Sequence, residues 1–133
     1  MTTRVLLVED DFLVAMTMES DLDAGNYDIT GVANSADAAV NLAKKTKPDL
    51  VVMDIRLVGP RDGVDAALEI FDATGIRCLF ATANADAQAR ARAVPAAPLG
   101  WLQKPYGREG LLSALADAVQ ALQSSLQPPP SAL

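Results

Sequence analysis

Short apolar runs alternate along this chain with longer stretches of helical period. The runs are rich in Val, Leu and Ile and cover residues 5–8, 27–33, 49–53, 77–81 and 100–103. Three of them are apolar at nearly every position, which is typical of parallel strands covered on both faces. The helical stretches cover residues 12–24, 35–45, 64–74, 84–93 and 108–122, and Gly or Pro follows most of them as a stop signal. The pattern predicts an α/β fold, a doubly wound (βα)5 unit with a five-stranded parallel sheet.

The length of 133 residues and an apolar content of 50% favour one domain with a single core. We place that domain at residues 1–122. After it, a Pro triplet at residues 128–130 cannot continue a helix, so the segment Gln123–Leu133 is predicted to be a mostly disordered tail.

Charge and hydropathy narrow the class of protein. Eleven basic against seventeen acidic residues give a net charge of −6, and the basic residues are scattered, which argues against direct nucleic-acid binding. No apolar stretch is long enough to span a membrane, and the N-terminus lacks the apolar region of a signal peptide. The single cysteine, Cys78, lies in an apolar run, which predicts a buried thiol. We therefore expect a soluble, cytoplasmic protein.

Polar side chains gather where the predicted strands end. Glu9, Asp10 and Asp11 follow the first strand, Asp54 the third, Thr82 the fourth and Lys104 the fifth. Ligands of open α/β sheets bind at the carboxyl ends of the strands, so we expect these groups to converge.

This set of groups has a chemical logic. Two or three carboxylates at one edge suit a hard divalent cation, and Mg²⁺ takes one or two carboxylates together with waters and a phosphate oxygen. An aspartate beside such an ion, with a lysine and a threonine hydroxyl nearby, has what it needs to attack a phosphoryl group. Without the metal, the carboxylates repel one another.

Taken singly, each residue also has an ordinary structural interpretation. Asp11 before Phe12 reads as a helix N-cap, Asp54 as an Asx turn, Thr82 as a cap for the next helix and Lys104 as a solvated side chain. Their joint occurrence at the right strand ends favours a site, while Asp11 remains the predicted cap.

Four motifs in register resemble the receiver domain of two-component response regulators, over residues 3–122. They are Val8-Glu9-Asp10, the stretch from Val51 through Asp54 to Leu57 with Gly63 closing the loop, Phe80-Ala81-Thr82-Ala83, and the stretch from Gly100 to Tyr106. The resemblance implies the flavodoxin-like fold of chemotaxis-type receivers and bacterial phosphorelay signalling.

The resemblance also implies a role for each residue. Asp54 is the implied phosphoacceptor, charged by a histidine kinase or a histidine phosphotransfer protein. Mg²⁺ or Mn²⁺ would be held by Glu9, Asp10, Asp54 and the backbone carbonyl of Arg56. Thr82 and Lys104 would contact the phosphoryl oxygens, small Ala83 would leave access to Asp54, and the Lys104-Pro105 bond is expected to be cis. Trp101 stands at the family's aromatic switch position, and its indole also suits a fixed place in the core.

The chain departs from the family pattern at two places. Phe80-Ala81-Thr82 resembles a receiver subgroup named for a Phe-Ala-Thr-Gly motif, whose single-domain members act in stress signalling, yet Ala83 replaces the Gly. Residues 93–99 carry two prolines where most receivers have a Gly-Ala turn, so we expect a short, Ala-rich and mobile fourth helix. In the family, downstream partners bind the face from the fourth to the fifth helix.

Several functions remain compatible with this sequence. A stand-alone receiver, not an enzyme beyond its own phosphorylation and dephosphorylation, would signal by binding a protein once phosphorylated or drain phosphoryl groups as a sink. The alternative is a degenerate receiver that binds proteins independently of phosphorylation. Two other classes fit less well. An aspartyl phosphatase would need a nucleophile and a second Asp two residues apart after the first strand, with a cap domain, and Glu9-Asp10-Asp11 does not supply that arrangement. A flavodoxin-like nucleotide binder would need a Ser/Thr/Gly-rich loop after the first strand, where this chain has acids.

Overall fold

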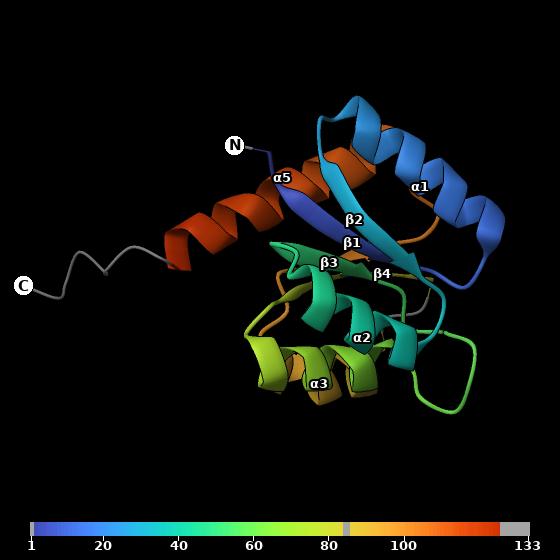
Figure 1. The fold of residues 1–133 in the computed structure, drawn as a ribbon, viewed down its shortest axis with the longest axis vertical. Helices are drawn as coiled ribbons and strands as arrows, with labels where there is room; N and C mark the ends of the chain where they lie inside the picture. Colours follow the sequence, from blue (N-terminus) through green and yellow to red (C-terminus); the bar gives the residue numbers. More distant parts are fainter. Residues whose placement is uncertain (1, 84–85, 126–133) are drawn as a thin grey trace, which may run out of the picture.

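Five parallel strands form one sheet in the order β2-β1-β3-β4-β5. The computed structural model describes residues 2–83 and 86–125. The strands are β1 (Arg4–Val8), β2 (Asp28–Ala33), β3 (Leu50–Met53), β4 (Cys78–Thr82) and β5 (Gly100–Gln103). The helices are α1 (Phe12–Ala24), α2 (Ala36–Thr46), α3 (Gly63–Thr74), α4 (Ala87–Ala93) and α5 (Arg108–Ser125), with a 3₁₀ turn at Val94–Ala96 (Figure 1). The predicted doubly wound (βα)5 fold is confirmed.

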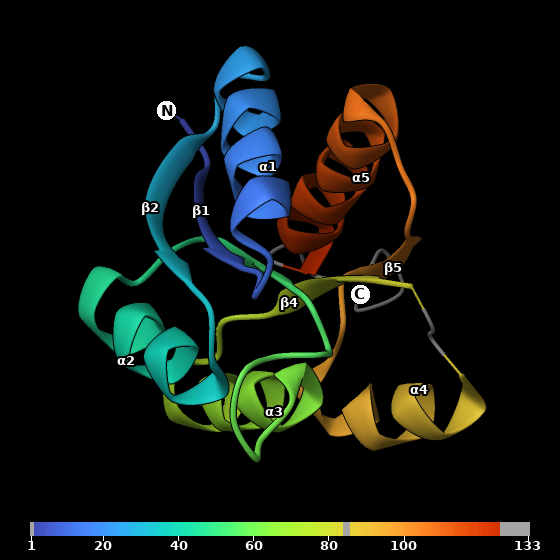
Figure 2. The same cartoon turned by 90° about the vertical axis from the view of Figure 1, so that its right-hand side faces the viewer.

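Helices cover both faces of the sheet. Helices α1 and α5 lie on one face, and α2, α3 and α4 lie on the other (Figure 2). The three central strands β1, β3 and β4 are buried along almost their whole length, as their continuous apolar sequences predict. The cysteine thiol lies in this core, and burial raises the pKa of Cys78 to about 12.

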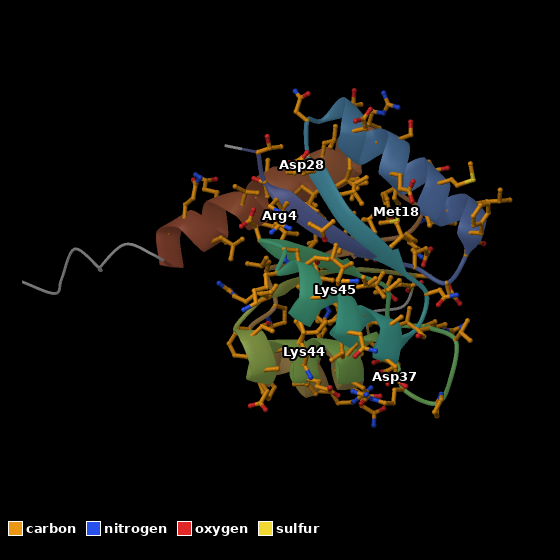
Figure 3. All side chains as sticks on the ribbon, viewed as in Figure 1. Arg4, Met18, Asp28, Asp37, Lys44 and Lys45 are labelled. Carbon is orange, nitrogen blue, oxygen red and sulfur yellow. The ribbon has the colours of Figure 1, made fainter. Side chains whose placement is uncertain are left out.

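Alternation along the strands divides the core into two layers. Successive strand residues point to opposite faces. Leu6, Val8, Val51 and Phe80 therefore pack with α2 and α3, while Val5, Leu7, Val52 and Leu79 pack with α1 and α5. Charged residues such as Asp37, Lys44 and Lys45 stay exposed on α2 (Figure 3). The sheet is thus fixed from both sides, and so are the ends of its strands.

Helix starts follow the predicted chemistry. Asp11 is the N-cap of α1, and its Oδ1 accepts from the amides of Leu13 (2.9 Å) and Val14 (3.2 Å). The cap interpretation of Asp11 is therefore confirmed. At α3, Asp62 and Asp65 form a capping box in which each side chain accepts from the other residue's amide.

Element boundaries differ from the predictions by a few residues. Helix α4 begins at Ala87, with Asp86 as its cap, whereas we expected a start at residue 84, which lies outside the described residues. Helix α5 continues to Ser125, beyond the expected end at Leu122, because residues 123–125 carry no helix breaker. The predicted tail from residue 126 onward lies outside the described residues.

The fourth helix is short and Ala-rich, as expected, and the 3₁₀ turn at Pro95 ends it. Its predicted mobility stays a prediction. Among the described helices, none has the length and apolarity needed to cross a membrane.

Candidate functional site

A cavity of about 240 Å³ opens at the carboxyl ends of four strands, where residues from β1, β3, β4 and the segment after β5 meet. Its lining includes every residue that the sequence placed at the phosphoacceptor and metal site: Glu9, Asp10, Asp54, Arg56, Thr82, Ala83 and Lys104. Asp11 and Val14 complete the lining. Trp101 and Pro105 are not part of it.

The backbone of the sheet positions these side chains. The amide of Glu9 donates to the Ala33 carbonyl (2.9 Å), and the amide of Asp54 donates to the Val8 carbonyl (3.0 Å). The amide of Lys104 donates to the Thr82 carbonyl (2.9 Å). Parallel pairing therefore continues one residue past each strand, which holds the polar groups at the rim of the rigid core.

Three carboxylates form the acidic part of the site. Glu9, Asp10 and Asp54 each offer an oxygen within 4.8 Å of the others. Glu9 is 2% exposed and Asp54 is 6% exposed, whereas Asp10 is exposed. Two of the three acids are thus removed from most of the water that would otherwise screen their repulsion.

Lys104 bridges the two buried acids. Its Nζ donates to Glu9 Oε1 at 2.8 Å and to Asp54 Oδ2 at 3.3 Å. Burial acts to lower the pKa of Lys104, but the two carboxylates outweigh it and raise the pKa, so the ammonium stays charged. The bond between Lys104 and Pro105 is cis, as expected. The sequence predicted the lysine at the site but not its pairing with Glu9.

Glu9 has a raised pKa. Burial, together with the neighbouring Asp54 carboxylate, raises the pKa of Glu9 to about 7, although Lys104 acts in the opposite direction. One oxygen, Oε2, is buried and has no hydrogen-bond partner among the described residues. A buried acceptor of this kind is costly unless a cation, or water held by one, satisfies it.

The residues present fit a hard divalent cation. They supply only oxygen ligands, they carry excess negative charge, and one buried oxygen lacks a partner. Arg56 lies at the site on the loop after β3, with an exposed side chain, and the role of its carbonyl stays a prediction.

Thr82 and Ala83 form the side of the cavity that follows β4. Thr82 is buried and Ala83 is exposed, so the small side chain leaves the approach to Asp54 open. Their placement matches the expectation for both residues, while their roles toward a phosphoryl group stay predictions.

Trp101 lies outside the cavity, on the face shared with α4. Its ring stacks on Phe80 with centroids 4.5 Å apart and an interplanar angle of 15°. The guanidinium of Arg90 lies 4.8 Å from the centre of the indole. The indole is half-buried in this stack, which agrees with a fixed core position and leaves its predicted switching untested.

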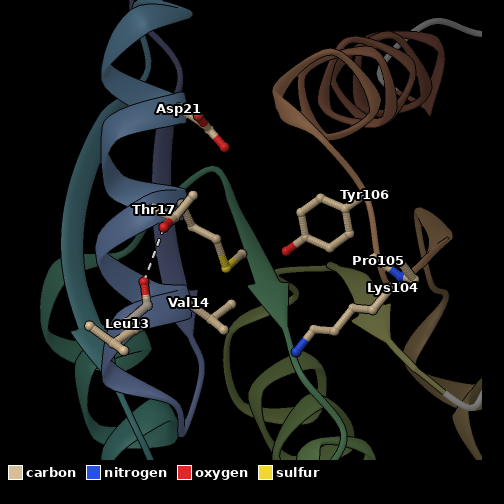
Figure 4. Close-up of a pocket in the computed structure, with 8 residues that line it drawn as sticks. Leu13, Val14, Thr17, Asp21, Lys104, Pro105 and Tyr106 are labelled. Carbon is tan, nitrogen blue, oxygen red and sulfur yellow. Dashed lines mark hydrogen bonds between the residues drawn. The ribbon is translucent and has the colours of Figure 1, made fainter.

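A second cavity, of about 370 Å³, lies beside the site between α1 and the segment after β5. Lys104 and Tyr106 reach from that segment toward α1, where Val14 and Thr17 line the same cavity (Figure 4). The Tyr106 hydroxyl is buried without a hydrogen-bond partner among the described residues. Sequence reasoning missed this apolar neighbour because its lining residues are separated by almost the whole chain.

Comparisons with known proteins agree with the fold. Residues 5–116 match the family model described as "Response regulator receiver domain". The chain is 37% identical over 116 residues to the transcriptional regulatory protein PdtaR of Mycobacterium tuberculosis, an alignment that covers 87% of this chain and 56% of that protein. The chain therefore spans about half the length of this relative. It is 32% identical to the chemotaxis protein CheY of Halobacterium salinarum, covering 91% of this chain and 100% of that protein.

A solved structure supports the same assignment. The signal receiver domain of a modulated diguanylate cyclase from Desulfovibrio desulfuricans superposes with a TM-score of 0.85 at 30% identity, covering 94% of this chain and 99% of that one. The family model covers most of the chain. The acids, threonine and lysine of the motifs predicted from the sequence meet in one cavity. The chain therefore belongs to the response regulator receiver domain family.

Proposed function

We propose that this receiver accepts a phosphoryl group on Asp54 in a reaction that depends on Mg²⁺ or Mn²⁺. The observation that carries the proposal is the convergence of Glu9, Asp10, Asp54, Thr82 and Lys104 in one cavity. Asp54 follows β3, the central strand of the sheet, and like Glu9 it contacts the ammonium of Lys104.

The transfer is an exchange of one bond for another. An oxygen of the Asp54 carboxylate attacks phosphorus, an O–P bond forms, and the bond to the donor breaks, with the electron pair leaving on the donor atom. With a phosphohistidine donor, that atom is an imidazole nitrogen. The product is an acyl phosphate on Asp54 and a free histidine on the donor protein.

The surrounding residues have distinct tasks in this proposal. Glu9, Asp10, Asp54 and the Arg56 carbonyl would hold the divalent cation, which offsets the charge on the transferring phosphoryl oxygens when bound. Lys104 would give up part of its contact with Asp54 and donate to a phosphoryl oxygen. The Thr82 hydroxyl would donate to another, and Ala83 leaves room for the donor to approach.

The exposed start of α1, which follows the acids of the cavity, fits a protein donor. Phe12 and Leu13, directly after the acids, are 75% and 72% exposed although they are large and apolar, and Met16 is exposed one turn later. A helix of a histidine kinase or phosphotransfer protein that delivers a phosphoryl group to Asp54 would cover these side chains and gain apolar burial.

For output, we propose binding of a protein partner to the face from α4 to α5, without enzymatic activity beyond the chain's own phosphorylation and dephosphorylation. A role as a phosphoryl sink uses the same chemistry without a downstream partner. An adaptor binds a target more tightly after phosphorylation, whereas a sink loses its phosphoryl group without gaining a partner.

Acetyl phosphate with Mg²⁺, followed by intact mass measurement, tests the central step. Wild type should gain one phosphoryl group, whereas Asp54→Asn, Asp10→Ala and wild type in EDTA should gain none. Asp11→Asn is the matched control from the same acidic run, and it should react like wild type. An adduct that survives Asp54→Asn, or none on wild type, would refute the proposal; the latter favours a degenerate receiver.

A further inference from the structure

Helix α4 is weakly held by apolar packing. Within Ala87–Ala93, only Ala93 is buried and Ala89 is half-buried, and the remaining side chains are exposed. Alanine methyl groups bury little surface, so they contribute little to fixing a helix against the sheet. The position of α4 therefore depends on its polar side chains.

Arg92 connects α4 to the start of α3. Its guanidinium donates to both oxygens of Asp62, at 2.9 and 3.2 Å, and to Oδ1 of Asp65 at 3.1 Å. These two acids are the capping box of α3, so one side chain of α4 contacts both members of the box. Bidentate arginine–carboxylate contacts of this kind are more specific in geometry than a single ion pair.

The box needs this cation because both of its members are acids. A usual capping box pairs an uncharged Ser or Thr with an acid, whereas Asp62 and Asp65 bring two negative charges together. Burial acts to raise the pKa of Asp62, but the hydrogen bonds from Arg92 and from the Asp65 amide outweigh it, and the pKa falls below its usual value. Arg92 thus offsets a repulsion that is built into the helix start.

The helix start is in turn packed against the phosphoacceptor. Gly63, the residue after Asp62, donates its amide to the Ile55 carbonyl at 2.7 Å. A Cβ added at Gly63 would lie 2.8 Å from the carbonyl carbon of Asp54 and 2.9 Å from the Cα of Ile55, which is too close for either atom. The first turn of α3 therefore fixes the backbone of Asp54 and Ile55.

A cavity of about 390 Å³ lies between α4 and the loop that follows β3. Its lining includes Ile55, Arg56, Thr82, Ala89 and Arg92. Ala89 and Ala93 supply the apolar contacts of α4 with the core, and Arg92 adds a polar contact at the edge of this cavity.

We propose that Arg92 is a positioning residue for the start of the phosphoacceptor loop, residues 54–56. From α4 it holds the Asp62 and Asp65 box, and through Gly63 it holds the backbone that presents Asp54 and the Arg56 carbonyl to the cation. The proposal deepens the proposed function and rests on it.

Amide hydrogen exchange and Mg²⁺ titration of the whole chain, both followed by NMR, test this connection. Arg92→Ala should speed exchange at the Gly63 and Asp65 amides and weaken Mg²⁺ binding, each by about twofold to fivefold, the range of a partly exposed ion pair. Arg92→Lys should restore part of the exchange protection and part of the Mg²⁺ affinity, since lysine keeps the charge but not the bidentate contact.

Arg61→Ala is the matched control. Arg61 is also a partly exposed arginine that binds two acids, Asp37 and Glu69, but it does not touch the box. It should leave Gly63 exchange and Mg²⁺ affinity unchanged. If Arg92→Ala does not fold, Asp62→Asn replaces it, because asparagine keeps the cap and removes the charge that Arg92 binds.

Unchanged exchange at Gly63 and unchanged Mg²⁺ affinity in Arg92→Ala, or equal changes in Arg61→Ala, would overturn the inference. These measurements require no phosphorylation. Failure of wild type to react with acetyl phosphate would therefore refute the proposed function while the exchange data still decide the role of Arg92.

Discussion

Substituting Gly63 by alanine tests the close contact between α3 and the phosphoacceptor. The glycine lies at the first position of α3, where alanine is ordinarily the better helix former by up to about 1 kcal/mol. The added methyl group, however, would lie under 3 Å from backbone atoms of Asp54 and Ile55. Because these atoms belong to the backbone, they cannot yield by a change of side-chain rotamer.

The expected cost follows from two losses. Overpacking a rigid core position costs about 1–3 kcal/mol, and moving α3 away also weakens the Gly63 to Ile55 hydrogen bond, at about 1 kcal/mol. After the gain in helix propensity, we expect Gly63→Ala to lower the free energy of unfolding by about 1–3 kcal/mol. With a urea dependence of about 2 kcal/mol per molar, the middle of the usual range, the midpoint should fall by roughly 0.5–1.5 M.

Urea unfolding followed by the fluorescence of Trp101, the chain's one tryptophan, measures this directly. Gly110→Ala is the control, because a Cβ there would meet Tyr106 at an ordinary 3.5 Å in the first turn of α5. It should be neutral or stabilising by up to about 1 kcal/mol. If Gly63→Ala is as stable as Gly110→Ala, the contact does not constrain the loop and the reasoning fails.

Three further predictions concern the cap, the thiol and the stacked indole. Asp11→Ala should lower the free energy of unfolding by about 1 kcal/mol, whereas Asp11→Asn should lose less, since asparagine also caps; equal losses in urea unfolding would contradict the cap assignment. The Cys78 thiol should not react with a thiol reagent at pH 8 until the protein unfolds, because its pKa of about 12 and its burial leave almost no accessible thiolate at any lower pH; rapid labelling of the native protein would disprove this. Arg90→Ala should shift Trp101 emission to longer wavelength and increase its quenching by acrylamide, because the guanidinium covers one face of the indole. Identical spectra and quenching would show that Arg90 does not shield it.

The fold could be predicted from sequence because local signals agree with it. The central strands are continuous apolar runs, and Gly25 and Gly75 follow helices at the expected places. The weakest signals lay in the fourth helix, where small alanines give no clear apolar face. The start predicted from the pattern was therefore too early, and the helix begins at Ala87.

The site was predictable at the level of which residues meet, since parallel strands bring their carboxyl ends to one edge. How they pair was not. The contact of Lys104 with Glu9 joins residues 95 positions apart, and the contact of Arg92 with Asp62 joins two elements whose separation depends on packing. Sequence spacing carries no signal for such tertiary ion pairs, and they appear only once the helices are placed.

The most direct test of the account is to locate the phosphoryl group chemically. An acyl phosphate on aspartate is reduced by borohydride to the alcohol, which converts that residue to homoserine and marks it permanently. After reaction with acetyl phosphate and Mg²⁺, reduction and peptide mass mapping, we predict homoserine at position 54 alone. Homoserine at position 10 or 11 instead, or unmodified peptides throughout, would contradict the assignment of Asp54 as the phosphoacceptor.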